Sequence, residues 1–275
     1  MLIRFWGVRG SISAPGAQTT RYGGNTPCLE VEGGDGQMLV LDAGYGVVGL
    51  GQRIMETGGG NGNATVHLIF THLHWDHIQG MPFFAPIYVP GNHVVIHSVS
   101  ERTARAAMER LFTSVYSPIK GVENLGASIS YEEIGEGLEL GGISLTPMIL
   151  DHGVPTLGFR VADERSVVVH ATDHEGGNPA CDGRLIEAAR GADLLIHDAQ
   201  FTSAEYQRYK GWGHSHTDAA LKNAREAGVK RLALFHYDPT HTDEDVDQQL
   251  LDARQQVTNG ELEVLAAAEG LELEV

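Results

Sequence analysis

The chain has 275 residues, of which 42% are hydrophobic and 20% are charged, so it is long enough for one large globular domain or two small ones. It carries 36 acidic and 19 basic side chains, including only four scattered lysines. The formal charge of −17 argues against binding to a long nucleic acid, which needs a basic surface. The sequence has no run of about eighteen apolar residues to predict a membrane span, and no apolar core of a signal peptide, so we expect a cytoplasmic protein.

Apolar and β-branched runs alternate with segments of helical spacing, which indicates an α/β protein. The predicted strands lie at residues 2–6, 28–32, 38–41, 65–70, 94–97, 143–150, 167–172, 194–197, 229–235 and 262–266. Helices are predicted at residues 45–57, 181–190 and 243–257, with a further helix capped by Ser100 and another that ends near Gly228. The cysteines, Cys28 and Cys181, form no metal-binding pair; a single disulfide stays open, but free thiols are expected in a reducing cytoplasm.

A long loop rich in Gly, Pro and Ser, residues 7–27, follows the first predicted strand. Loops of this length often carry function. Arg9, Arg21 and Asn25 are candidates for holding an anionic substrate, because guanidinium and amide groups donate hydrogen bonds to oxyanions. Surface charge alone would account equally well for the two arginines.

Four potential metal ligands fall within six positions, in the order H-x-H-x-D-H at residues 72–77. They begin where the predicted strand 65–70 ends. In extended backbone alternate side chains point the same way, so His72 and His74 can reach one ion. Asp76 and His77 come after a turn and would face a second point nearby. Imidazole and carboxylate groups suit Zn²⁺, Mn²⁺ or Fe; the alternative is a solvated histidine-rich loop.

Five predicted strands run into a His or an Asp, and open α/β sheets place their sites at the carboxyl ends of strands. These residues are His72, His152, Asp173, Asp198 and His236. Their recurrence across both parts of the chain suggests two similar βα halves that share one site. Because no long linker divides the sequence, we expect a single domain covering residues 1–275.

Residues 71–80 resemble the second motif of the metallo-β-lactamase superfamily, in both the leading Thr-His and the ligand order. The resemblance implies a four-layer αββα sandwich with two metal ions at one edge. It implies a first ion held by His72, His74, His152 and Asp173, and a second held by Asp76, His77, Asp173 and His236. Asp42 resembles the Asp of the first motif, which supports the metal loop rather than binding metal. Asp198 has no open place among these ligands and is expected to support one of them.

Other segments resemble the phosphodiesterase and ribonuclease-Z-like branch of that superfamily. One begins at His152 and reads His-x-x-Pro-Thr-x-Gly-Phe-Arg. Another, Gly213-His214-Ser215, resembles a motif whose His assists catalysis, so His214 is the expected general acid. His216 replaces the Thr that usually follows His-Ser, which leaves open whether His214 or His216 has this role. His170 and His174 are expected to be structural.

The resemblance therefore predicts a hydrolase with two divalent ions, Zn or Mn with Fe as a further option. Two such ions can activate a shared water, and Asp76 would orient the resulting hydroxide for attack on a phosphodiester. The acidic surface favours a small substrate such as a cyclic nucleotide or a cyclic phosphate, and no long basic arm for tRNA is present. The alternatives are a thiolester or carboxylic ester hydrolase, an RNA-processing nuclease, and a metal-binding sensor without turnover. A homodimer also stays open.

Overall fold

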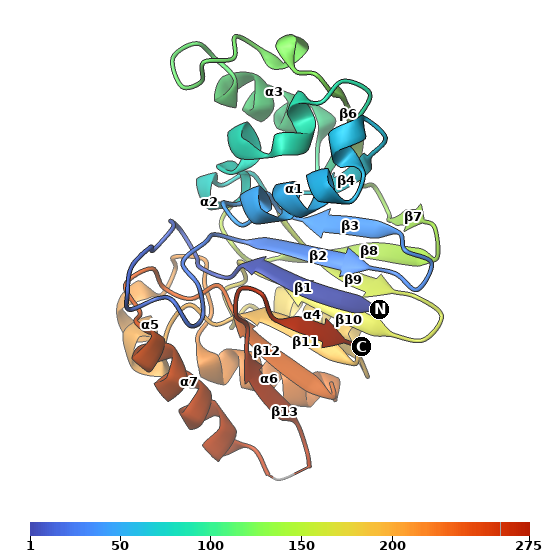
Figure 1. Cartoon of the computed structure of the whole chain (residues 1–275). Helices are drawn as coiled ribbons and strands as arrows, with labels where there is room; N and C mark the ends of the chain where they lie inside the picture. Colours follow the sequence, from blue (N-terminus) through green and yellow to red (C-terminus); the bar gives the residue numbers. More distant parts are fainter. Residues whose placement is uncertain (259) are drawn as a thin grey trace.

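Two mixed β-sheets of seven strands each face one another, as Figure 1 shows for the computed structural model, which describes residues 1–258 and 260–275. The first sheet has the order β14 (Glu272–Glu274), β1 (Leu2–Gly7), β2 (Cys28–Glu32), β3 (Met38–Leu41), β4 (Thr65–Ile69), β5 (His93–Ser98) and β6 (Ser128–Glu133). The second has the order β13 (Glu263–Ala266), β12 (Arg231–Phe235), β11 (Leu194–Asp198), β10 (Val167–Ala171), β9 (Thr156–Ala162), β8 (Ile143–Leu150) and β7 (Leu138–Leu140).

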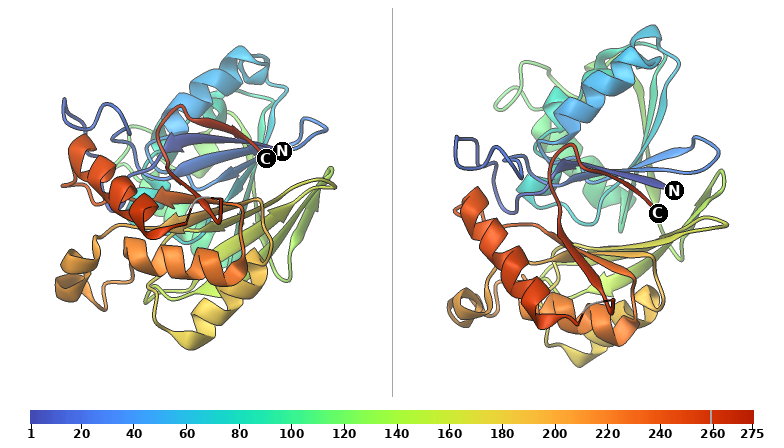
Figure 2. Two further views of the ribbon diagram at one scale, coloured as in Figure 1. Left: turned by 90° about the horizontal axis from the view of Figure 1, so that it is seen from below. Right: turned by 60° about the horizontal axis from the view of Figure 1, so that its bottom comes forward.

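Helices cover the outer face of each sheet, so the molecule has the four αββα layers that the sequence predicts (Figure 2). On the first sheet lie α1 (Val47–Glu56) and α3 (Glu101–Leu111), and on the second lie α4 (Pro179–Ala189), α6 (Thr217–Ala227) and α7 (Asp243–Gln256). Two shorter helices, α2 (Trp75–Ile78) and α5 (Ser203–Tyr209), lie in connections at one edge of the sandwich (Figure 1). Single 3₁₀ turns lie at Gly59–Asn61, Met81–Phe83, Ala85–Tyr88 and Val122–Asn124.

The two halves of the chain pair their strands in the same pattern. From β1 to β6 the neighbouring pairs are antiparallel, antiparallel, parallel, parallel and parallel. From β8 to β13 the pairs follow the same series. The third strands of the two series, β3 and β10, are therefore equivalent, and each is followed by an Asp. This agrees with two similar halves that each direct polar residues to one edge.

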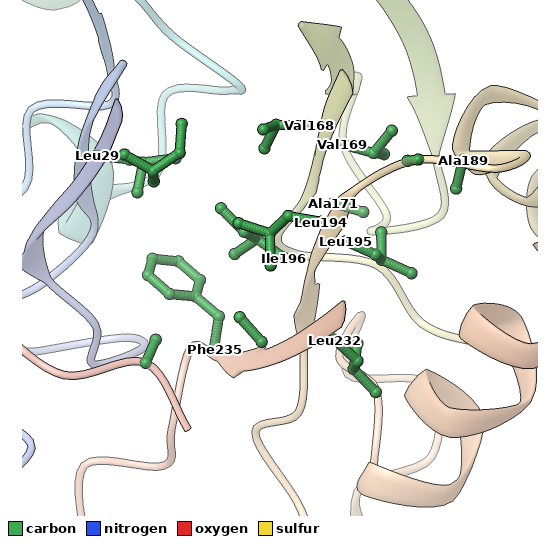
Figure 3. Packing of buried hydrophobic residues seen from close by; sticks show 14 of the residues in the cluster. Leu29, Val168, Val169, Ala171, Ala189, Leu194, Leu195, Ile196, Leu232 and Phe235 are labelled. Carbon is green, nitrogen blue, oxygen red and sulfur yellow. The ribbon is translucent and has the colours of Figure 1, made fainter. Parts of the chain in front are cut away.

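The main core lies between the sheets. In Figure 3, Leu29 of β2 faces Ile196 of β11 and Phe235 of β12 across this space, and all three are 0–1% exposed. A second apolar cluster separates the first sheet from its helices, where Leu68 and Ile96 meet Leu50 and Met108. The inner parallel strands β5, β10, β11 and β12 are buried along nearly their whole length, which explains their largely apolar sequences. The burial of apolar surface in these two layers provides the main stabilisation of the fold.

The predicted elements agree with the structure, which adds the short helices α2 and α5, three edge strands and one internal strand. Ser100 caps α3 as expected, with its hydroxyl accepting from the Thr103 amide. Residues 156–162 form β9, although Gly158 and Arg160 interrupt its apolar pattern. The edge strands β6, β7 and β14 were not predicted because they are short or polar. Cys28 and Cys181 are buried free thiols. In the described part of the chain, no helix is both long and apolar enough to cross a bilayer.

Candidate metal centre

One edge of the sandwich collects the residues that follow six strands, β3, β4, β8, β10, β11 and β12. The last three are mutually parallel and β3 is parallel to β4, so within each sheet these strands end on the same side. The loops after them carry the polar side chains that the sequence singles out. Loops from both sheets contribute side chains, and the potential ligands gather where these loops meet.

The first group of potential ligands contains three imidazoles, those of His72, His74 and His152. Their ligand atoms lie within 4.8 Å of one another, and their ring centroids are 4.4–4.8 Å apart in edge-on pairs. His72 and His74 follow β4 in the first sheet, whereas His152 follows β8 in the second. This spacing suits three nitrogen ligands of a single ion.

The second group contains Asp76, His77, Asp173 and His236, which are all buried and have ligand atoms within 4.8 Å of one another. Oδ2 of Asp76 lies 3.4 Å from Nε2 of His77 and 3.3 Å from Nε2 of His236. Two imidazoles and two carboxylates form a donor set that Zn²⁺ and Mn²⁺ both accept.

The carboxylate of Asp173 lies between the two groups. Its Oδ1 is 3.4 Å from Nε2 of His152 and 3.9 Å from Nε2 of His72. Its Oδ2 is 3.1 Å from Nε2 of His77 and 3.4 Å from Nε2 of His236. Each oxygen thus faces a different set of imidazoles, which is the arrangement of a carboxylate that can bridge two cations.

Within the described residues, three of the four imidazole nitrogens that face Asp173 make no hydrogen bond. Nε2 of His72, of His77 and of His236 is buried without a hydrogen bond. A buried nitrogen left unpaired is costly, and coordination to a cation would satisfy it. Burial holds the pKa of His72 well below its usual value, so this imidazole is neutral, as a ligand must be. The residues present therefore fit two divalent ions.

Asp42 supports the loop of residues 71–77, which carries four of the potential ligands. Its Oδ2 lies 2.8 Å from Nδ1 of His77, which turns Nε2 of that ring toward the centre. The Thr71 amide donates to Oδ1 at 2.8 Å, and the Thr71 hydroxyl donates to Oδ2 at 2.9 Å. Such contacts fix the orientation of a ligand, which is the supporting role expected for Asp42.

His214 lies directly beside both groups. Its ring centroid is 4.9 Å from that of His152 and 5.0 Å from that of His236. Nδ1 is 2.9 Å from Oδ2 of Asp198, which also accepts from the Asp173 amide at 3.1 Å. Asp198 thus orients His214 and the backbone of Asp173 together. With Nδ1 committed to Asp198, Nε2 is the nitrogen of His214 available for proton transfer.

The other histidines near the motif positions point elsewhere. Nδ1 of His216 is 3.1 Å from the Ser203 hydroxyl, and its ring lies 4.5 Å from that of Tyr206. This placement favours His214 over His216 as the acid. His174 pairs with a carboxylate outside the centre, and His170 packs in the core against Phe235. Both placements agree with the structural roles expected for these two residues.

The three residues expected to hold an anion are engaged in other contacts. The guanidinium of Arg9 is fully buried and donates to the backbone carbonyls of residues 23, 238 and 241. Arg21 is exposed and pairs with Asp247 at 2.5 Å. The Asn25 amide donates to Glu269 at 2.8 Å. The loop is therefore held by these side chains, and the structure corrects the expectation that they grip a substrate.

Several contacts at the centre had no clear signal in the sequence. The Ser11 amide donates to Oδ2 of Asp76 at 2.8 Å, and Oε1 of Gln200 lies 3.1 Å from Nδ1 of His236. The carbonyl of Gly213 lies 2.7 Å from Nδ1 of His152. A side chain at Gly213 would meet that imidazole at 2.5 Å, so only glycine lets the two approach. The Gly-His-Ser pattern is the only sequence feature that marks any of these contacts.

Three site residues adopt left-handed backbone angles that non-glycine residues rarely occupy. The φ angles are 62° at Asp42, 56° at Asp173 and 66° at His236, and each residue follows a strand closely. Such conformations cost on the order of 1 kcal/mol or more and persist only where the surroundings impose them. The backbone is therefore strained at these three positions of the site.

Comparison with known proteins adds two kinds of finding. The family model described as the β-lactamase superfamily domain matches residues 38–237, which is well over half of the chain. The ribonuclease Z of Haloferax volcanii is 28% identical over 291 residues, covering 88% of this chain and 87% of that protein.

Solved structures resemble the chain over nearly its full length. The metallo-β-lactamase fold protein YhfI from Bacillus subtilis has a TM-score of 0.71 at 22% identity, covering 99% of this chain and 98% of that one. A diphosphatase from the PhnP family has a TM-score of 0.68 at 19% identity, covering 100% and 97%. At these identities the likeness shows the shared fold.

Proposed function

Because the chain belongs to the metallo-β-lactamase superfamily of metal-dependent hydrolases, we propose that it is a phosphodiesterase for small substrates such as a cyclic nucleotide or a cyclic phosphate. The observation that carries the proposal is the position of Asp173, whose two oxygens face separate groups of imidazoles. Both sheets supply ligands, so we treat residues 1–275 as one functional domain. The ions would be Zn²⁺ or Mn²⁺, which both accept this donor set.

Two bound divalent ions would supply an activated water and would neutralise charge on a phosphoryl group. The side chains of this protein then have separate tasks. Asp76 is fixed by the Ser11 amide and can orient the attacking water. Asp198 holds His214 by Nδ1, so that Nε2 can deliver a proton to the departing oxygen. This division of roles matches phosphodiester cleavage, in which the leaving alkoxide needs a proton.

An RNA-processing nuclease is the second candidate, since relatives named ribonuclease Z cover most of the chain. The charge of −17 opposes it, because counterion release from RNA requires many basic contacts. Arg9 and Arg21, the two arginines of the loop near the site, are already engaged by protein groups. A small diester needs no such contacts, because two cations can neutralise its single charge.

The test combines metal analysis with a panel of substrates. Purified protein reconstituted with Zn²⁺ or Mn²⁺ should hold two ions per chain, as the two ligand groups require. It should hydrolyse a bis-aryl phosphodiester and at least one cyclic nucleotide, and should cleave a tRNA precursor poorly. Only residual metal after reconstitution would refute the dinuclear centre. Efficient tRNA cleavage without turnover of small diesters would favour the nuclease instead.

A further inference from the structure

Exposed apolar side chains lie in the segments that carry the candidate metal centre. Trp75 follows His74 directly and is 56% exposed, and Trp212 precedes Gly213 and is 66% exposed. Four other exposed large apolar residues lie in the segments that contact or carry the centre: Ile12, Tyr45, Phe83 and Val154. An exposed tryptophan loses the stabilisation that burial would give it, so two of them beside one site point to a bound partner group.

Trp212 is held in place although it is exposed. The carboxylate of Glu175 accepts from the Gly211 amide at 2.6 Å and from the Gly213 amide at 2.8 Å, on either side of Trp212. The same carboxylate accepts from the Tyr206 hydroxyl at 2.8 Å. These bonds fix the loop before any ligand arrives. A preformed surface loses little conformational entropy when it binds.

An aromatic series connects Trp212 to the proposed acid. The indole meets the ring of Tyr209 edge-on at 5.2 Å, and Tyr209 stacks on Phe201 at 4.7 Å. Phe201 in turn meets His214 edge-on at 6.3 Å. Trp212 therefore has one edge supported by its neighbours while most of its surface faces solvent.

Trp75 is linked to the same side of the centre. Nδ1 of His74, the residue before it, is 3.0 Å from Nε2 of His152. Nδ1 of His152 is 2.7 Å from the carbonyl of Gly213, the residue after Trp212. One imidazole thus separates the two backbone segments that carry the tryptophans. Each tryptophan is therefore the sequence neighbour of a residue that contacts His152.

The charges around the centre indicate what the tryptophans could contact. Within the described chain, the partners of Asp76, Asp173 and Asp198 in ion pairs are all histidines. No lysine or arginine there is paired with these carboxylates to offer a second anion site. The exposed side chains beside the centre include two tryptophans, so stacking contacts could hold the rest of the substrate. Indole rings stack well on flat heteroaromatic groups.

We propose that Trp212 and Trp75 form a stacking platform for the nucleobase of the substrate, while the metal centre holds its phosphate. This rests on the proposed phosphodiesterase function, and it narrows the substrate class to nucleotide diesters. Every nucleobase has a flat face that can stack. The platform should therefore require a base in the substrate without distinguishing one base from another.

The first experiment measures binding without turnover. Adenosine monophosphate and ribose 5-phosphate are titrated against the metal-loaded protein while tryptophan fluorescence is followed. Both probes carry the same phosphate, and only the first carries a base. The nucleotide should quench the fluorescence and bind about tenfold to a hundredfold more tightly than the sugar phosphate. Equal affinity for the two probes would overturn the platform.

The second experiment uses substitutions and kinetics. Trp212→Ala and Trp75→Ala should each raise KM for a cyclic nucleotide about tenfold or more, and Trp212→Phe should retain most of the binding. KM for a base-free ribose cyclic phosphate should stay unchanged. Tyr116→Ala is the matched control, because Tyr116 is 79% exposed but lies in the connection between α3 and β6. It should leave both KM values unchanged.

The outcomes separate this proposal from the one on which it rests. If no diester is hydrolysed but base-dependent quenching is seen and is lost in Trp212→Ala, the phosphodiesterase proposal fails and the platform stands. If cyclic nucleotides are hydrolysed and the tryptophan variants behave like Tyr116→Ala, the platform is wrong and the function stands. An equal loss on substrates with and without a base would also overturn the platform, since the tryptophans would then only shape the metal loop. Should an Ala variant fail to fold, Trp212→Phe against Trp212→Leu gives the same comparison.

Discussion

His214 donates from Nδ1 to Asp198 over 2.9 Å, which fixes the ring and leaves Nε2 as the nitrogen for proton transfer. A ribose alkoxide leaves only with a proton, whereas a nitrophenolate leaves without one. We expect His214→Ala to slow hydrolysis of a nucleotide diester about 10²- to 10⁴-fold and that of a nitrophenyl diester far less. Steady-state rates on both substrates, with metal content as a check, measure this difference.

The neighbouring residues supply the controls for this prediction. His216→Ala should affect neither substrate strongly, because His216 contacts Ser203 and Tyr206 away from the centre. Asp198→Asn should weaken the orientation of His214 and give a smaller loss with the same dependence on leaving group. Equal losses on both substrates in His214→Ala would mean that His214 binds substrate or supports the fold.

The bridging position of Asp173 predicts that its loss affects two ions together. Asp173→Ala should impair both sites, since each of its oxygens faces a different group of imidazoles. His236→Ala should loosen mainly the second site, because the ring of His236 faces Asp76 and one oxygen of Asp173. Metal titration of the two variants followed by elemental analysis distinguishes them. Independent loss of a single ion in Asp173→Ala would contradict the bridge.

Metal affinity should rise with pH because protons occupy the centre when metal is removed. Burial lowers the pKa of His236, but the carboxylates of Asp173, Asp76 and Asp198 outweigh it and raise this pKa to about 9. Below that pH an incoming ion must displace the proton. The apparent affinity should therefore increase roughly tenfold per pH unit for each proton released, until the pH approaches about 9. Competition with a chromophoric chelator across this range measures the slope, and a flat profile would exclude linked proton release.

A second histidine pair, outside the metal centre, predicts acid sensitivity. Nε2 of His97 lies 3.0 Å from Nδ1 of His67, and burial followed by the charge of His67 lowers the pKa of His97 to about 4. The unfolded chain, with a pKa near 6.5, binds more protons between these values, so stability is lost as the pH falls from about 6.5 to about 4. His97→Gln should remove on the order of 1–3 kcal/mol of this pH dependence in unfolding curves.

The ligand set could be anticipated because it depends on local patterns. His72, Asp173 and His236 each follow an apolar strand. The parallel strands β10, β11 and β12 bring Asp173 and His236 to one edge of the second sheet, and the facing of the two sheets adds His72 from β4. The same recurrence suggests two similar halves, but not the series of antiparallel and parallel pairs that both halves share. The superfamily and the αββα layers, which the resemblance of residues 71–80 implies, are both confirmed.

The contacts that the loop arginines make in the folded chain could not be predicted from the sequence. Arg9 lies in a loop of Gly, Pro and Ser residues, which is typical of exposed segments. In the folded chain, its guanidinium donates hydrogen bonds to the carbonyl groups of residues 238 and 241. These bonds depend on packing between segments more than 200 residues apart. The strand β9 was also missed, since Gly158 and Arg160 break its apolar pattern although β8 and β10 pair with it on both sides. Both the burial of Arg9 and the formation of β9 depend on contacts with segments that are distant in the sequence.

The left-handed backbone angles at Asp42, Asp173 and His236 have a consequence for protein engineering. At Asp42 and Asp173, asparagine has the same shape as aspartate and adopts left-handed angles readily, so it would relieve part of this strain and favour the metal-free fold. A selection for thermal resistance alone would therefore favour replacement of these carboxylates of the site. Variants selected in that way would have a higher melting temperature but would lose activity. A screen of this protein must therefore measure turnover together with melting temperature.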